Sequence, residues 1–109
     1  MYTVDLHLKN ETAESAITNL HASIKLARKT KEKTMCLIVG YGSTGGTHKI
    51  KTAILNELLE LKNHNKIKGY ICGNELDIFN VNYQKLKNKE LIEKDALKRK
   101  NPGEIIVIL

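Results

Sequence analysis

The hydrophobic positions along this chain switch between two periods, which predicts strands separated by helices. Residues 1–7 alternate apolar Tyr2, Val4 and Leu6 with polar neighbours, the pattern of a half-buried strand. Asn10 is a favourable helix N-cap, and the apolar residues that follow it recur every three or four positions. They predict a helix to about residue 31 and are Ala13, Ala16, Ile17, Leu20, Ile24 and Ala27.

The middle of the chain repeats the pattern. Residues 35–39 form a continuous apolar run, typical of a strand buried on both faces. An apolar stripe from about Thr47 to about His64 predicts a second helix, and residues 67–72 predict a third strand. Short strands joined by helical crossovers favour parallel neighbours with right-handed connections.

The composition changes between residues 75 and 101, where Lys, Asn, Glu and Leu dominate. Helical spacing around Leu86 and again over 91–97 predicts a helical insertion with a loop at 77–82. Pro102-Gly103 turns the chain, and the apolar residues 105–109 predict a final core strand. We therefore expect a single α/β domain over residues 1–109, a two-layer sandwich of order βαβαβ(+helical insertion)β. Its four-stranded sheet should be mixed and mostly parallel, with the helices packed on it.

Composition narrows the setting of this domain. The chain has 109 residues, 18 Lys plus Arg against 12 Asp plus Glu, and a formal charge of +6. A small basic domain attracts polyanions, and because only Arg28 and Arg99 are arginines, we expect lysine contacts to phosphate rather than bidentate base readout. Cys36 and Cys72 lack metal-ligand spacing and indicate reduced thiols. We expect a cytoplasmic protein without membrane contact; its oligomeric state stays open.

A glycine-rich loop between the second strand and the second helix is the strongest motif. Glycines let backbone N–H groups and a helix N-terminus approach an anion. The dinucleotide and P-loop fingerprints both fail here, since this strand is not the first and Gly46 stands where the P-loop lysine would be. We expect an anion-binding loop; a tight structural turn is the alternative. The residues expected to bind phosphate or nucleic acid are Gly40, Tyr41, Gly42, Ser43, Thr44, Gly45, Gly46, Lys49 and Lys51.

Asp5 and His7 form the second candidate element. Strand alternation puts them on one face with Leu6 opposite, and a right-handed crossover brings them to the same sheet edge as the glycine loop. A carboxylate beside an imidazole can act as an acid/base pair, which suits phosphodiester cleavage next to an anion site. A capped loop start is the structural alternative. No cofactor is specified; the pair leaves room for a divalent ion, Mg²⁺ or Mn²⁺.

Three segments together resemble the Smr (small MutS-related) domain family: V-D-L-H-L over 4–8, I-V-G-Y-G-S-T-G-G-T-H-K-I-K over 38–51, and G-E-I-I-V-I-L over 103–109. The resemblance implies a two-layer sandwich on a βαβαββ core. It also implies binding of DNA or RNA and nicking endonuclease activity, a class linked to DNA repair, recombination or RNA processing. Carried over by position, it singles out Asp5, His7, Gly40, Gly42, Thr44, Gly45 and Lys51.

The departures from the family pattern open a second hypothesis. Val39 stands where the family has the histidine of H-G-x-G, Leu8 replaces the glycine of D-L-H-G, and the last loop carries the insertion. His48 is the candidate to replace the missing imidazole. The alternative is a binding module that has lost catalysis and holds nucleic acid or a phosphorylated ligand. A third hypothesis, a protein-interaction domain, requires an exposed apolar stripe over Leu86, Leu91, Ile92 and Leu97.

Overall fold

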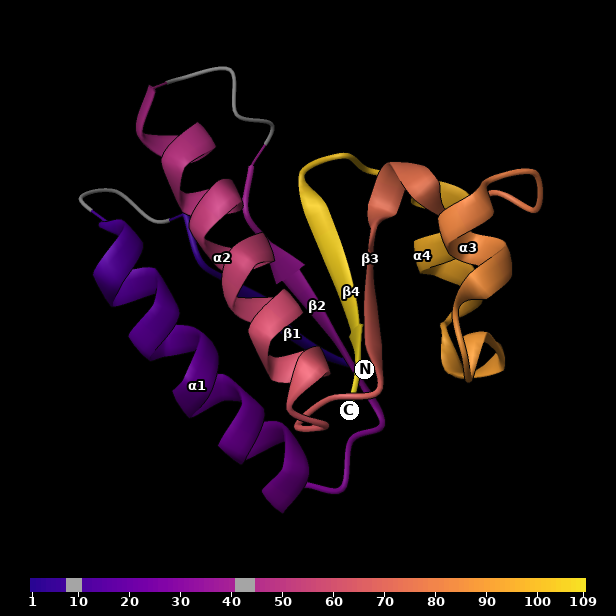
Figure 1. Ribbon diagram of the computed structural model, residues 1–109, viewed down its shortest axis with the longest axis horizontal. Helices are drawn as coiled ribbons and strands as arrows, with labels where there is room; N and C mark the ends of the chain where they lie inside the picture. The colour runs from indigo at the N-terminus through magenta and orange to yellow at the C-terminus, as the bar shows by residue number, and fades with distance from the viewer. Residues whose placement is uncertain (8–10, 41–44) are drawn as a thin grey trace.

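A computed structural model describes residues 1–7, 11–40 and 45–109 of the chain, and within the first turn of the second helix, residues 45–48, it describes the backbone only. The secondary structure is β1 (Tyr2–Asp5), α1 (Ala13–Lys29), β2 (Thr34–Ile38), α2 (Gly45–Asn63), β3 (Gly69–Cys72), η1 (Gly73–Glu75), α3 (Val81–Lys85), η2 (Lys89–Leu91), α4 (Lys94–Arg99) and β4 (Glu104–Ile108). This is the predicted α/β class, with β and α elements in βαβαββ order around an insertion (Figure 1).

The two long helices form where the apolar spacing predicts them, but α1 begins later than expected. Its N-cap is Thr12, whose hydroxyl accepts the Ser15 N–H at 3.1 Å, while the Ser15 hydroxyl accepts the Thr12 N–H at 2.9 Å. This reciprocal capping box satisfies two backbone donors at the helix start. The predicted cap, Asn10, lies outside the described residues. None of the described helices is long and apolar enough to cross a membrane.

The sheet is mixed, as predicted, but it is not mostly parallel. Its strand order is β1-β2-β4-β3, and only β1 and β2 pair in parallel, with Asp5 opposite Ile38. Strand β4 is antiparallel to both β2 and β3. The insertion returns the chain to the carboxyl edge of the other strands, so β4 must run backwards. Its residues are all buried, which suits a central position and leaves β3 at the edge.

Side chains alternate between the two faces of the sheet and build two hydrophobic clusters. Met35, Leu37 and Ile105 point toward α1 and α2, where they join the larger cluster. Cys36 and Ile106, which neighbour them in sequence, belong to the smaller cluster beneath the insertion. The insertion therefore forms a third layer, so the expected two-layer sandwich is a three-layer arrangement (Figure 1).

The insertion is built from short pieces, α3, η2 and α4, rather than from long helices. Its apolar residues face the sheet: Ile92 is buried, and Leu86, Leu91 and Leu97 are partly buried against the smaller cluster. The protein-interaction hypothesis requires these residues to form an exposed apolar stripe, and that prediction is wrong. Within the described part of the insertion, the large apolar side chains that are exposed lie in the loop before α3 and at the start of α3, namely Ile78, Phe79 and Val81.

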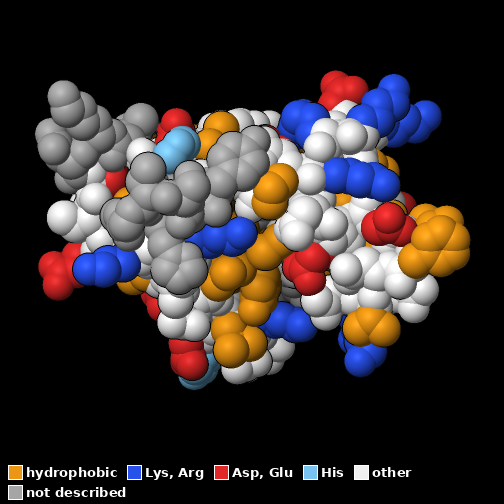
Figure 2. All heavy atoms as spheres, turned by 90° about the horizontal axis from the view of Figure 1, so that it is seen from above, with side chains coloured by type: hydrophobic (Ala, Val, Ile, Leu, Met, Phe, Trp, Pro, Cys, Tyr) orange, Lys and Arg blue, Asp and Glu red, His pale blue; other side chains and the backbone are white. Residues whose placement is uncertain are grey.

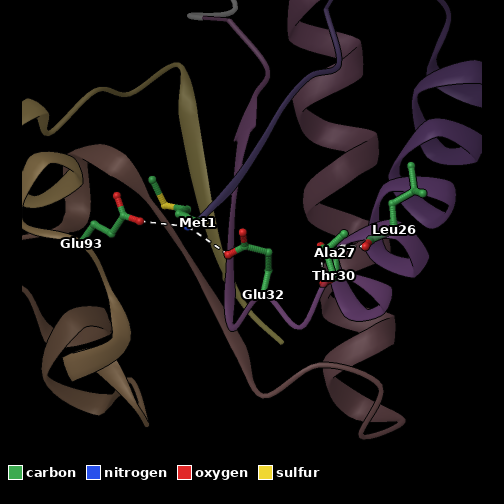
Figure 3. A network of polar contacts seen from close by, with 6 residues as sticks. All are labelled: Met1, Leu26, Ala27, Thr30, Glu32 and Glu93. Carbon is green, nitrogen blue, oxygen red and sulfur yellow. Dashed lines mark hydrogen bonds and ion pairs between the residues drawn. The ribbon is translucent and has the colours of Figure 1, made fainter.

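A polar network ties the start of the chain to two other segments. The Met1 amine lies 2.9 Å from a Glu93 carboxylate oxygen and 3.0 Å from a Glu32 carboxylate oxygen (Figure 3). Glu93 belongs to the insertion, and Glu32 to the turn between α1 and β2. Hydrogen bonds to these two carboxylates raise the pKa of the amine. The network joins β1 to the insertion at the end of the sheet where both chain termini lie (Figure 1).

Candidate active site

Asp5 and His7 meet at the carboxyl edge of the sheet, as the alternation of β1 predicts. The Nδ1 of His7 lies 2.6 Å from the Oδ1 of Asp5, and the same oxygen accepts the backbone N–H of His7 at 2.9 Å. The His7 side chain is 33% exposed and the Asp5 side chain is 39% exposed. With Nδ1 engaged, Nε2 is the ring nitrogen left for a ligand. The pair, called here the dyad, is thus oriented and reachable from solvent.

The start of the glycine loop lies at the same edge. The Leu6 N–H donates to the Ile38 carbonyl at 2.8 Å, which extends the β1–β2 ladder beyond the strand ends and carries His7 level with the residues that follow β2. Gly40 has a φ of 79°, a value that favours glycine. The N–H groups of Val39 and Gly40 both donate to the Gly103 carbonyl. Gly40 is therefore fixed against the turn that leads into β4.

The rest of the glycine loop can be placed only in part. Tyr41, Gly42, Ser43 and Thr44 lie outside the described residues, as do the side chains of Thr47 and His48. The backbone of Gly45 and Gly46 opens α2, a 19-residue helix without an acidic residue in its first turn. Its N-terminal dipole therefore points at this edge uncompensated by its own side chains.

The two predicted lysines of α2 differ in their surroundings. Lys49 is exposed. The Lys51 ammonium donates to the Pro102 carbonyl at 2.9 Å and is partly buried. Because an ammonium has three donors, this bond leaves two for a ligand while it holds the turn before β4 against α2. Lys51 thus has a structural contact that its predicted phosphate-binding role did not include.

Glu104 is a buried carboxylate at this edge that the sequence did not single out. It stands opposite Ile38, which stands opposite Asp5, so Asp5 and Glu104 share one row across three strands. The Nε of Arg99 donates to Glu104 at 3.0 Å, which fastens α4 to the sheet. The sequence signal was weak, because Glu104 begins an otherwise apolar run.

Cys36 lies in the same layer as Glu104. Burial raises the pKa of its thiol to about 12, and the negative charge of Glu104 acts in the same direction. Burial also raises the pKa of Cys72. A raised pKa keeps a thiol protonated and less reactive, which fits a packing role in the interior of the fold. This agrees with the expectation of reduced structural thiols, and both are free cysteines.

Other acidic residues near the ends of the strands are engaged in local structure. Glu75 accepts the Cys72 N–H at 3.2 Å and also bonds the Asn82 amide. Asp77 pairs with Lys100 at 3.6 Å. Positive and negative side chains are accordingly intermixed on the view onto this edge (Figure 2). Within the ranges the structure describes, no group of three His, Cys, Asp or Glu side chains could hold a metal ion.

A second histidine–carboxylate pair shows that a short contact by itself does not identify an active site. His21 of α1 lies 2.6 Å from Glu57 of α2, the same separation as in the dyad. It links two helices on the helical face of the sheet, away from the glycine loop. What distinguishes the dyad is its place at the carboxyl edge of the sheet, level with the start of the glycine loop, since its internal distance is matched elsewhere.

No protein-family model, curated protein or solved structure matches this chain.

Proposed function

We propose that this chain is a nucleic-acid-binding domain of the Smr type that cleaves phosphodiester bonds at the carboxyl edge of its sheet. The contact of 2.6 Å between His7 Nδ1 and Asp5 Oδ1, in a pair open to solvent, is the observation that carries the proposal. The resemblance over residues 4–8, 38–51 and 103–109 supplies the substrate class. DNA and RNA are both candidate substrates.

In the proposed reaction Asp5 holds the imidazole through Nδ1, so that Nε2 of His7 accepts a proton from an attacking water or hydroxyl group. The new phosphorus–oxygen bond forms as the bond to the leaving oxygen breaks. That oxygen takes up a proton from solvent, and His7 returns the proton it accepted to solvent. Backbone N–H groups of the glycine loop and the start of α2 would hold the phosphate, with Lys49 and Lys51 adding charge. The donor set among the described residues does not fit a protein-held metal.

A specific observation favours a second candidate, a binding module without catalysis. Val39, at the position of the family's loop histidine, has no exposed surface and belongs to the core on the helical side of the sheet. No side chain from that position can reach a substrate. If one imidazole is insufficient for cleavage, the edge would still hold a phosphate group through backbone donors.

Cleavage of fluorescent single-stranded DNA and RNA oligonucleotides and of supercoiled plasmid tests the first candidate. We expect His7→Ala to reduce the cleavage rate by at least about 10²-fold, the usual contribution of a positioned acid or base. His21→Ala is the matched control, because it removes an imidazole with the same carboxylate distance, and it should keep the wild-type rate.

Equal rates for wild type and His7→Ala would overturn cleavage at the dyad. Binding of the oligonucleotides without turnover by the wild-type protein would support the second candidate instead. Asp5→Asn adds a readout, since a residue that only positions His7 should alter the pH profile of the rate as well as its height.

A further inference from the structure

The end of the sheet opposite the dyad carries a groove with a strongly positive lining. The groove encloses about 610 Å³ between the ends of α1 and α2, the start of β3 and the loop after α3. No Asp or Glu side chain lines it. Its cationic residues come from four separate segments of the chain and are Arg28, Lys62, Lys66, Lys68, Lys85 and Lys87.

Local structure accounts for only part of this charge. Arg28 and Lys62 lie in the last turns of α1 and α2, where cations compensate the helix dipole. The Arg28 guanidinium also bonds the Lys66 carbonyl, so it positions the loop before β3. Lys66, Lys68 and Lys87 lie in no helix. Across the residues with described side chains, no lysine of the groove forms an ion pair, whereas Lys100 and Arg99 near the other end both do.

The groove continues along the edge strand in a less charged section of about 410 Å³, lined in part by Tyr70, Asn56, Asn82 and the Glu75 carboxylate that bonds the Asn82 amide. Lys62, Lys85 and Leu86 line both sections. The hollow therefore runs beside β3 between α2 and α3, with cations at one end and an aromatic ring, amide groups and one carboxylate at the other.

We infer that this groove binds single-stranded nucleic acid, with the phosphate backbone on the lysines and a base in the section that holds Tyr70. A positive groove with an aromatic platform is the arrangement by which proteins hold single strands. Six like charges in one hollow repel each other, and a ligand with closely spaced phosphates relieves that repulsion. The inference shares with the proposed function only the class of ligand, since the lysine-lined section of the groove and the dyad lie at opposite ends of the sheet.

Fluorescence anisotropy with a labelled twelve-nucleotide dT or rU strand, over a series of salt concentrations, tests the inference. The triple variant Lys66→Ala, Lys85→Ala, Lys87→Ala should bind at least about tenfold more weakly at 0.1 M salt. Its salt slope should be shallower by about 2, since each lost phosphate contact removes about 0.7 from the slope. The matched control is Lys25→Ala, Lys94→Ala, Lys98→Ala, which makes the same change in net charge at exposed positions outside the groove and should stay within about twofold of wild type.

Three results would overturn the inference. Equal losses in the two triple variants would mean that net charge alone attracts the strand. Polyglutamate competing as well as the oligonucleotide at equal charge concentration would assign the groove to acidic proteins. Tighter binding of the corresponding duplex would exclude a single-strand site. Thermal melting of each variant confirms folding, and we expect the groove variant to melt no lower than wild type, because its substitutions remove repulsion.

The groove and the dyad can fail separately. Binding that depends on Lys66, Lys85 and Lys87 in a protein without turnover supports the groove and counts against cleavage at the dyad. The opposite result is turnover that depends on His7 while the groove variant changes neither the rate nor the affinity for the oligonucleotide. That result supports the dyad and contradicts binding in the groove. Performing the binding series in the His7→Ala background keeps the strand intact during the measurement.

Discussion

The carboxyl edge of the sheet and the lysine-lined groove use charge in opposite ways. At the carboxyl edge, charged side chains are engaged by the protein itself: Arg99 with Glu104, Lys51 with the Pro102 carbonyl, Asp5 with His7. At the other end six cationic residues line an open groove without an acidic side chain among them. The comparison teaches that part of the positive charge of this chain gathers in one groove, where no acidic side chain neutralises it.

The two ends of β3 also differ in how tightly the backbone is packed: the carboxyl end is tightly packed and the groove end is looser. Gly73, which follows β3 at the carboxyl edge, is so close to the backbone of Asn101 that a Cβ would lie 2.1 Å from its carbonyl oxygen. Gly69, at the groove end of the same strand, would place a Cβ 2.9 Å from the tip of the Leu86 side chain. One end is closed by backbone that cannot yield, and the other by a side chain that can rotate.

The largest expected effect tests this difference in packing. Gly73→Ala should lower the free energy of unfolding by about 3 kcal/mol or more, since overpacking against fixed backbone forces the turn before β4 to move. Gly69→Ala, its matched control on the same strand, should cost less than about 1 kcal/mol because Leu86 can change rotamer. Urea denaturation followed by circular dichroism measures both. Equal costs would remove the distinction between a rigid edge and a yielding one.

A smaller effect tests whether the charges of the carboxyl edge hold the fold. Glu104→Gln should cost about 1–2 kcal/mol, because it weakens a charge-assisted hydrogen bond to Arg99 from a nearly buried position. Asp77→Asn breaks the exposed pair with Lys100 and should cost less than about 0.5 kcal/mol. The same denaturation experiment applies. If Asp77→Asn were the costlier change, the insertion would be held at its surface and not by α4 against the sheet.

The last effect is absent at neutral pH and concerns alkaline conditions. The pKa of Cys36 is raised from 9.0 to about 12 in the fold, so the folded chain keeps a proton that the unfolded chain releases. Its stabilising contribution is complete below about pH 9 and falls as pH rises toward 12, by about 1 kcal/mol per pH unit. The raised pKa values of Tyr70 and Cys72 act with the same sign.

Denaturation of wild type and Cys36→Ala under reducing conditions at pH 7, 9, 10 and 11 isolates this contribution. The wild-type stability should fall more steeply above pH 9 than that of the variant. Parallel curves would show that Cys36 is not protected in the fold, and that the sheet interior beside Glu104 admits water.

The sequence predicts the elements well because local patterns specify them. The alternation of residues 1–7 predicts that Asp5 and His7 share a face, and their contact confirms it. The glycine at position 40 is needed for its positive φ, as the loop motif indicates. These features depend on residues within one element or turn, where spacing alone fixes the geometry.

The misses concern relations between distant segments. The apolar pattern of residues 105–109 predicts a strand but does not predict its neighbours. In the structure this strand is antiparallel to both β2 and β3. The groove lysines lie at positions 62–68 and 85–87, and in the sequence each group looks like a solvated helix end or loop. Their convergence depends on how the insertion folds back over the sheet, which is decided by packing against Cys36 and Ile106 and not by local periodicity.

The position of β4 has a consequence for how the molecule folds. It is the last strand in the sequence but lies inside the sheet, where it provides the pairing for β3 and one of the two neighbours of β2. Until residues 104–108 are synthesised, β2 and β3 have open edges and the two hydrophobic clusters lack their shared wall. Such non-local pairing is slow to form and exposes apolar surface meanwhile. A chain interrupted before Glu104 therefore loses the centre of its sheet, and cooperative folding must wait for that final strand.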